Sequence, residues 1–220
     1  MPVRSRADGS VLEKPLQYIL EGTLQNMARP PLFDTALLLD AAVRLAAEAG
    51  PAAVTMSAVA AAVGAPSGSV YHRFAGRPAL LAEVWLRTVE RFQEGYFAAL
   101  RSAPDPRAAG AAAARHVVAW SRAHPGEAAL LLYGARDFGR DGWPAEYAER
   151  ADRGHRRVRD AMNALARDLG ARTPQDTERV SLAVIDVPLS LVRRHLRGGT
   201  PLPGHAEDLA EACTAALLAG

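Results

Sequence analysis

The chain has 220 residues, of which 49% are apolar and 23% are charged, a composition that suits a packed core and excludes a disordered chain. The net charge of +2 excludes a polycation, so any nucleic-acid contact has to depend on local charge. The single cysteine, Cys213, excludes an intrachain disulfide. The sequence shows neither a signal peptide nor an unbroken apolar run of about 20 residues, so we expect a cytoplasmic protein without membrane contact.

Residues 1–33 differ in character from the rest of the chain, and we expect them to form an N-terminal extension. Two interpretations of this segment stay open. In the first, the segment contains an accessory amphipathic helix. In the second, the protein starts at Met27 with the segment MARPPLFD, and residues 1–26 are not native. The apolar residues that would form the stripe of the helix are Leu12, Leu16, Ile19, Leu20, Leu24 and Met27.

From residue 34 onward, apolar residues recur every three or four positions and β-branched residues do not alternate, a pattern that predicts an all-α fold. Asp34 is a candidate N-cap of a first helix that ends at Ala49. Thr55 can cap a second helix over 56–63, and a third occupies about 66–74. Longer helices are expected at about 78–100, 107–123, 126–133, 144–169, 174–196 and 205–218, separated by Pro and Gly residues.

Two of the longer helices carry unusual residues. Arg150, Arg153 and Arg157 share one face of the helix at 144–169, which is either a solvated face or a patch for an anionic ligand or a second nucleic-acid contact. Asp186 and Pro188 fall inside the helix at 174–196, where we expect a local kink and a carboxylate whose hydrogen bonding is satisfied.

The segment from Thr55 to Phe74 has the spacing of a helix-turn-helix. Ala60 is small enough for two helices to cross, Gly64 permits a left-handed turn, and Val70 can pack the second helix on the first. The second helix offers polar groups and a close backbone approach to DNA at Ser67, Gly68, Ser69, Tyr71 and His72, with Arg73 and Arg77 beside it.

Local charge agrees with a DNA contact, because no Asp or Glu occurs between Glu48 and Glu83. The alternative is that Tyr71 and Phe74 are core anchors of a small helical subdomain whose polar residues are ordinary surface.

The stretch VTMSAVAAAVGAPSGSVYHRFAGRPALL resembles the N-terminal DNA-binding domain of TetR-family transcriptional regulators. The resemblance implies a three-helix helix-turn-helix domain at 34–78, followed at 79–220 by a helical bundle that binds an effector and dimerises. By position, Thr55 caps its helix and reaches a phosphate, and Ser57 lies near the DNA. The recognition surface consists of Gly68, Ser69, Tyr71 and His72.

Two positions depart from the pattern of the family. Arg77 stands where members commonly have a phosphate-contacting lysine, and its guanidinium can hold phosphate as well. Pro66 stands where many members have the serine that caps the recognition helix, so Ser67 is the alternative cap.

The resemblance further implies a homodimer, formed through the helices at about 174–196 and 205–218, that binds a pseudo-palindromic double-stranded DNA operator. A small-molecule effector would release this repressor, although an activator would use the same motif. We expect the effector pocket to be mostly apolar with a few polar groups. The candidate lining residues are His116, Trp120, Tyr133, Phe138, Trp143 and Tyr147.

The sequence lacks the local motifs of enzymes: HExxH, GxSxG, SxxK, a P-loop and GxGxxG are all missing, and no two histidines are spaced i, i+4. We therefore expect no catalytic residues, no metal and no cofactor. Two other classes stay open: a small-molecule binding protein that does not bind an operator, and an enzyme that uses the helical pocket.

Overall fold

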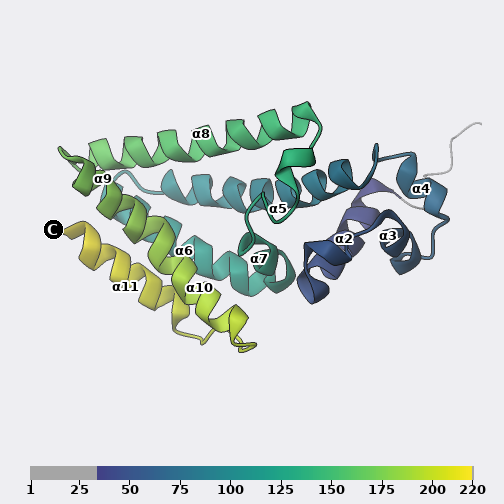
Figure 1. Ribbon diagram of the computed structural model, residues 1–220. Coiled ribbons are helices and arrows are strands. Elements are labelled where there is room, and N and C mark those ends of the chain that lie inside the picture. Colours follow the sequence, from purple (N-terminus) through teal and green to yellow (C-terminus); the bar gives the residue numbers. More distant parts are fainter. Residues whose placement is uncertain (1–33, 220) are drawn as a thin grey trace, which may run out of the picture. The chain divides into compact units, whose positions relative to one another are not determined.

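The computed structural model describes residues 34–219, so both interpretations of the N-terminal extension concern residues outside the described part. Residues Thr35–Gly220 form one compact unit. The predicted all-α fold is confirmed, since the described residues contain helices and turns and no strand (Figure 1). The elements are α2 (Thr35–Ala49), η1 (Pro51–Ala53), α3 (Met56–Ala62), α4 (Ser67–Tyr71), α5 (Arg77–Leu100), α6 (Pro106–Ala123), α7 (Pro125–Leu131), η2 (Arg140–Gly142), α8 (Ala145–Asp168), α9 (Pro174–Ser181), η3 (Leu182–Asp186), α10 (Val187–Arg197) and α11 (Ala206–Ala219).

Side-chain caps fix the starts of several helices. The Thr55 hydroxyl accepts from the Ala58 N–H at 3.1 Å at the start of α3, as predicted. The Asp105 carboxylate accepts from the Ala108 N–H at 2.8 Å at the start of α6. A complete capping box starts α9. These caps satisfy amide groups that have no partner inside the helix, so the boundaries are set locally.

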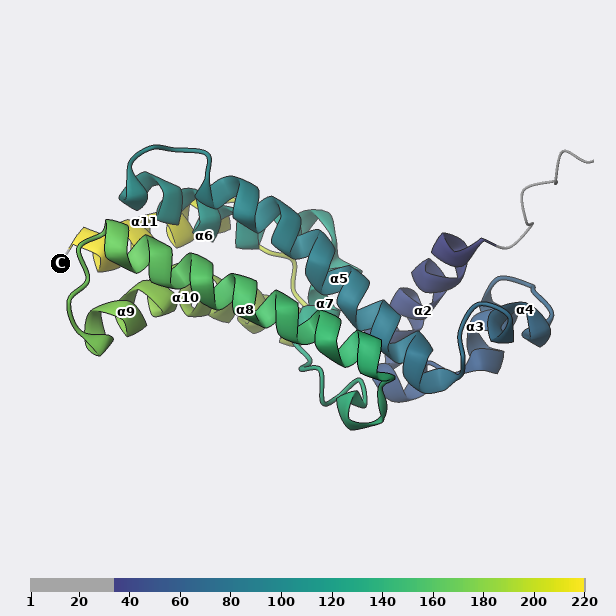
Figure 2. The ribbon, with the colours of Figure 1, turned by 90° about the horizontal axis from the view of Figure 1, so that it is seen from above.

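Two hydrophobic clusters form the core. The first joins α2, α3 and α4 to the first half of α5, and it also includes Leu130, Phe138 and Trp143. The second joins the far half of α5 to α6, α8 and the helices that follow. Both views show α5 and α8 side by side over most of their lengths, and α6 beside α11 (Figures 1 and 2). Helix α5 belongs to both clusters and connects them.

The helix predicted at 174–196 consists of three segments, α9, η3 and α10, and η3 is a π-helix. Pro188 lacks the N–H that would bond to the carbonyl of Val184, four residues earlier. Tyr96 of α5 donates its hydroxyl to this buried carbonyl at 3.2 Å, and Thr214 of α11 donates to the Ala183 carbonyl at 2.8 Å. Burial raises the pKa of Tyr96, so it remains a donor.

The predicted interruption near Pro188 is therefore present, but the expected role of Asp186 was wrong. Asp186 is exposed and makes no hydrogen bond within the described part of the chain. Neighbouring helices donate hydrogen bonds to the backbone carbonyls of Ala183 and Val184 and not to the Asp186 carboxylate.

Candidate nucleic-acid interface

The turn between α3 and α4 has the geometry that the sequence predicted. Gly64 has φ +67°, and its N–H donates to the Ala61 carbonyl at 3.1 Å, while the Ala65 N–H donates to the Ala60 carbonyl at 2.9 Å. This pair of bonds is a Schellman motif, which ends α3 and reverses the chain direction. Ala60 is 2% exposed and Val70 is fully buried, so α4 is packed firmly against the rest of the domain.

Helix α4 divides into a buried and an exposed side. Val70 and Phe74 belong to the first hydrophobic cluster, whereas Tyr71 is 61% exposed, the largest exposure among the exposed large apolar side chains of the described residues. Ser67, Gly68 and His72 are exposed too, and Ser69 is half-buried. The interpretation of Tyr71 as a core anchor is therefore wrong, although Phe74 is one.

The start of α4 differs from the expectation for Ser67. Pro66 occupies the N-cap position, no side chain caps the helix, and Ser67 is the first helical residue. At the start of α3, by contrast, Ser57 is exposed and its hydroxyl lies 3.2 Å from that of Thr55. Two hydroxyls are thus placed together at one helix N-terminus, where backbone amides and the helix dipole favour an anion.

Arg77 ties the start of α5 to the segment before α3. Its Nε donates to the Val54 carbonyl at 2.7 Å, and its Nη2 donates to the Pro51 carbonyl at 3.0 Å. Arg73 donates from Nη1 to the Ser69 carbonyl at 3.2 Å. The phosphate contact expected of Arg77 stays a prediction, but the structure gives this side chain a bracing role that sequence reasoning missed.

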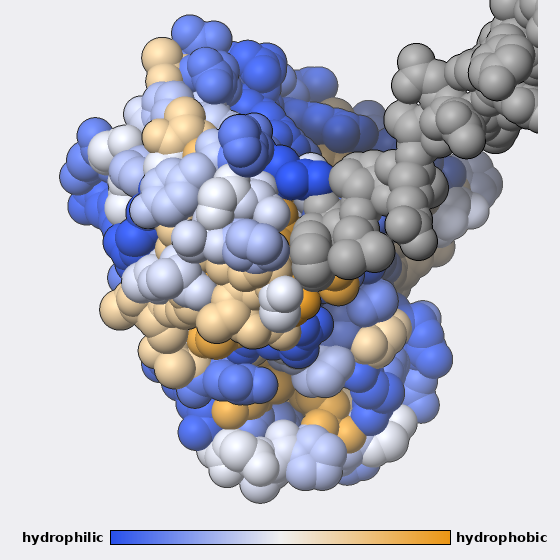
Figure 3. All heavy atoms as spheres, turned by 90° about the vertical axis from the view of Figure 1, so that its right-hand side faces the viewer, coloured by the Kyte–Doolittle hydropathy of each residue, from blue (hydrophilic) through white to orange (hydrophobic). Residues whose placement is uncertain are grey.

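The face that carries α3 and α4 is suited to a polar partner. Its upper part shows mainly pale and blue residues, and a band of tan and orange residues crosses the middle (Figure 3). Residues 49–82 contain no acidic side chain. Arg73 and Arg77 therefore act without a competing carboxylate in this stretch, which favours a phosphate backbone.

The six candidate effector residues do not converge. His116 and Trp120 of α6 lie against Phe92, with ring centroids 5.6 and 5.3 Å away, and burial lowers the pKa of His116. Tyr133, Phe138, Trp143 and Tyr147 instead lie in or around the first hydrophobic cluster.

Within that second group, the Trp143 N–H donates to the Phe138 carbonyl at 2.8 Å, and the Phe138 side chain is fully buried. Burial is the main cause that raises the pKa of Tyr147. The structure places these aromatic residues largely as packing groups, and their role in ligand binding stays a prediction.

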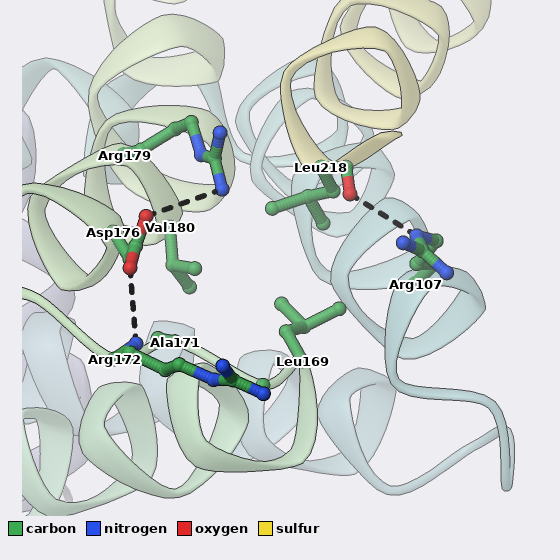
Figure 4. Close-up of a pocket in the computed structure, with 9 residues that line it drawn as sticks. Arg107, Leu169, Ala171, Arg172, Asp176, Arg179, Val180 and Leu218 are labelled. Carbon is green, nitrogen blue, oxygen red and sulfur yellow. Dashed lines mark hydrogen bonds and ion pairs between the residues drawn. The ribbon is translucent and has the colours of Figure 1, made fainter. Parts of the chain in front are cut away.

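One of the six candidates, Tyr133, lines a cavity of about 490 Å³, and other cavities of the helical body are lined by none of them. A cleft of about 740 Å³ lies between α5 and α8 and is lined by Gln93, Arg101, Arg153 and Arg157, among others. Another cavity, of about 210 Å³, lies near the end of α11, where the Arg107 guanidinium donates to the Leu218 carbonyl and Asp176 accepts from the Arg172 N–H (Figure 4). The sequence indicated one feature of the first cleft, because it placed Arg153 and Arg157 of the lining on one face of a helix.

The described residues contain neither a membrane-spanning helix nor a metal site. No helix among them is both long enough and apolar enough to cross a bilayer. No group of three or more His, Cys, Asp or Glu residues in this part of the chain is arranged to hold a metal ion.

Comparison with known proteins agrees with this architecture. Residues 38–84 match the family described as "Bacterial regulatory proteins, tetR family". The chain is similar in structure to the TetR family transcriptional regulator PfmR from Thermus thermophilus, with 21% identity over 86% of this chain and 97% of that chain and a TM-score of 0.62. It is also similar to the transcriptional regulator FadR from Bacillus subtilis in complex with stearoyl-CoA, with 13% identity, coverage of 85% and 99%, and a TM-score of 0.66.

A third similar structure is that of a TetR-like transcriptional regulator from Rhodococcus sp. RHA1, with 23% identity, coverage of 84% and 95%, and a TM-score of 0.62. A comparison with curated proteins finds no match. The helix-turn-helix and the helical body together have the fold of these similar structures. The match over residues 38–84 confirms the resemblance to the N-terminal domain of the tetR family that the sequence shows.

Proposed function

We propose that the chain is a homodimeric transcriptional repressor that binds a pseudo-palindromic operator through α4 and is released by a small-molecule effector. The observation that carries the proposal is the exposure of Tyr71, His72, Ser67 and Gly68 on a short helix whose other side is locked by Val70. In a dimer, the two copies of α4 would enter successive major grooves about 34 to 36 Å apart, or a multiple of that distance.

We propose that the predicted domain boundary near residue 78 acts as a hinge between α2–α4 and the helical body, although Thr35–Gly220 pack as one compact unit. Helix α5 begins at Arg77, next to the DNA-binding helices, and continues into the second cluster. An effector that binds better to a conformation with another spacing of the α4 helices would weaken operator affinity by that difference in binding energy. The stearoyl-CoA complex of the similar FadR supports an effector for this fold.

The proposed dimer face lies on η3 and α11. Leu182 and Leu209 are each 44% exposed, and exposed Ala212 and Ala216 follow Leu209 at helical spacing. Apolar groups in this arrangement are favourable when a second copy covers them. We expect Leu182→Asp to shift the chain towards monomer in sedimentation velocity without lowering its helix content. An unchanged sedimentation coefficient would exclude Leu182 from the dimer contact.

The experiment for DNA binding is selection from a random duplex pool, followed by footprinting of the recovered sequence. We expect a two-fold related site, and we expect Tyr71→Ala to weaken its binding by about 1–3 kcal/mol, because a side chain at the base edges is lost. Dimer content serves as the control, since Tyr71 lies far from η3 and α11 in sequence. A well-folded variant with unchanged affinity would refute the role of Tyr71, and an unenriched pool would favour a helical protein that binds only small molecules.

A further inference from the structure

The described residues contain a buried donor that has no acceptor. The indole N–H of Trp85 on α5 is the sole buried side-chain nitrogen or oxygen in the described part of the chain without a hydrogen-bond partner. Leaving such a buried donor unpaired is unfavourable, because it has lost its hydrogen bonds to water. Trp143, its neighbour at 5.7 Å between ring centroids, does donate its N–H to a carbonyl. Trp85 instead lines a small cavity of about 110 Å³ between α5 and α8.

Gln93, two helical turns further along α5, is a second polar group without a partner. Gln93 is 9% exposed, and its carboxamide makes no hydrogen bond within the described residues. A Cβ placed at Gly154 of α8 would lie 3.7 Å from Gln93 Oε1, so the carboxamide reaches the facing helix. Gln93 lines both the small cavity beside Trp85 and the larger cleft, so the two cavities meet at this residue.

The charge of this cleft is positive. Arg150 is already paired with Glu83 and Glu90, at 2.8 and 2.5 Å. Arg101 and Arg157 have no carboxylate partner within the described residues, and Arg153 has only a loose contact of 3.9 Å with Glu149. The remaining carboxylate at the cleft is Glu94. Three arginines against one unpaired carboxylate favour an anionic group, which guanidinium donors bind with strong hydrogen bonds.

An apolar slot continues from the arginines. Arg101 and Arg157 also line a cavity of about 310 Å³ together with Phe97, Leu100 and Leu165. Asp168, the last residue of α8, is the carboxylate of this lining, so the apolar part and not the anionic group of a ligand belongs here. The Arg157 guanidinium carbon lies 4.1 Å above the centre of the Phe97 ring, which holds this arginine at the junction of the cleft and the slot. An anion in the cleft can therefore place an apolar body in the slot.

We propose that the α5–α8 cleft binds an amphipathic organic anion. Its anionic group lies among Arg101, Arg153 and Arg157, its apolar part lies against Phe97 and Leu165, and Gln93 donates to its oxygens. This inference rests on the proposed effector-responsive function, since it names the chemical class of the effector. Because the ligand contacts α5 directly, its binding energy can bias the helix that begins beside the DNA-binding domain.

Anilinonaphthalene sulfonate, whose fluorescence rises in an apolar site, is the probe, and N-phenylnaphthylamine is its neutral counterpart. We expect saturable binding of the sulfonate by the full chain. We expect the double variant Arg153→Gln/Arg157→Gln to weaken this binding about tenfold or more, because two charge-assisted contacts are lost. The matched control is Arg156→Gln/Arg159→Gln, which removes the same charge from exposed positions of the same helix and should change binding by less than about twofold.

Two single variants make the test independent of folding defects. Arg153→Gln alters an exposed side chain and should weaken the sulfonate but not the neutral probe. Gln93→Met removes the carboxamide that lines the cleft and keeps the length of the side chain, so it should weaken sulfonate binding without lowering the melting temperature. Equal sulfonate affinity in the cleft and control double variants would overturn the proposal, as would equal losses for both probes.

DNA affinity is measured on the same proteins without probe. A double variant that loses nonspecific DNA affinity and keeps sulfonate affinity would make this face a second nucleic-acid contact and refute the anion site. Absence of operator binding by the unchanged chain would refute the proposed function alone, because sulfonate binding is scored separately.

Discussion

Glycines show where this chain needs free space and where it needs close contact. A Cβ at Gly68 of α4 would meet no atom within 4 Å, whereas a Cβ at Gly95 of α5 would lie 2.3 Å from Cε1 of His116. The His116 ring is held by two residues of α5, because its Nε2 lies 3.2 Å from the Phe92 carbonyl and its ring packs on Phe92 and Tyr96. The glycine in α5 is thus required by packing, and the glycine in α4 is not.

Gly68→Ala tests whether the backbone of α4 approaches DNA. The fold has room for the methyl group, and alanine favours a helix by about 1 kcal/mol over glycine, so stability should not fall. Operator affinity should fall, because the methyl group would stand between the backbone and the DNA. Thermal melting and operator titration measure the two effects. Unchanged operator affinity would show that this backbone stays away from the bases.

Gly95→Ala and Gly154→Ala form a matched pair on the facing helices α5 and α8. We expect Gly95→Ala to destabilise the protein by about 1–3 kcal/mol through overpacking against His116. Gly154→Ala should be neutral or stabilising by up to about 1 kcal/mol, because its nearest neighbour would lie at 3.7 Å. Urea denaturation measures both, and equal effects would contradict the packing described here.

The helix-turn-helix could be predicted from sequence because its determinants are local. Ala60, Gly64 and Val70 lie within one short segment, and each acts through its own backbone or size. The α5–α8 cleft could not be predicted, since it depends on which residues of two distant helices face each other. The aromatic candidates failed to converge for the same reason: residue type indicates burial, but not which side chains share a cavity.

Helix junctions hold the elements in place. Arg77 braces the start of α5 on the carbonyls of Pro51 and Val54, and Tyr96 and Thr214 satisfy the carbonyls of η3. In both cases one helix supplies donors to irregular backbone of another segment. The break at η3 follows from Pro188, which the sequence shows, but the donors that satisfy it come from α5 and α11.

Arg77 can be tested by two substitutions. Arg77→Ala should lower stability by about 1 kcal/mol, because carbonyl contacts of a partly exposed guanidinium are lost. If Arg77 also contacts phosphate, DNA affinity should fall for all sequences and the salt slope should decrease by about 1. Arg77→Lys keeps the positive charge but lacks the several N–H donors of a guanidinium. It should therefore have the salt slope of the unchanged chain but the lower stability of Arg77→Ala. A slope unchanged in Arg77→Ala would leave only the bracing role.

Helix α5 connects the proposed functions of the molecule. Its first residue braces the segment before α3, its middle carries Trp85 and Gln93, and its far half packs in the second cluster. A conformational change at the cleft can therefore be transmitted along α5, which packs in both hydrophobic clusters, to the cluster that contains α4. Coupling between the cleft and α4 requires that α4 binds DNA with sequence selectivity, because allostery needs two binding sites.

The most direct test of that requirement is fluorescence anisotropy of the full chain with its selected operator and with a scrambled duplex, over a range of salt concentrations. We expect operator affinity to exceed scrambled affinity by about a thousandfold or more, and we expect this preference to survive as salt weakens both. Equal affinities that vanish together as salt rises would show that only phosphate charge is recognised, and would contradict a regulator that reads its operator through α4.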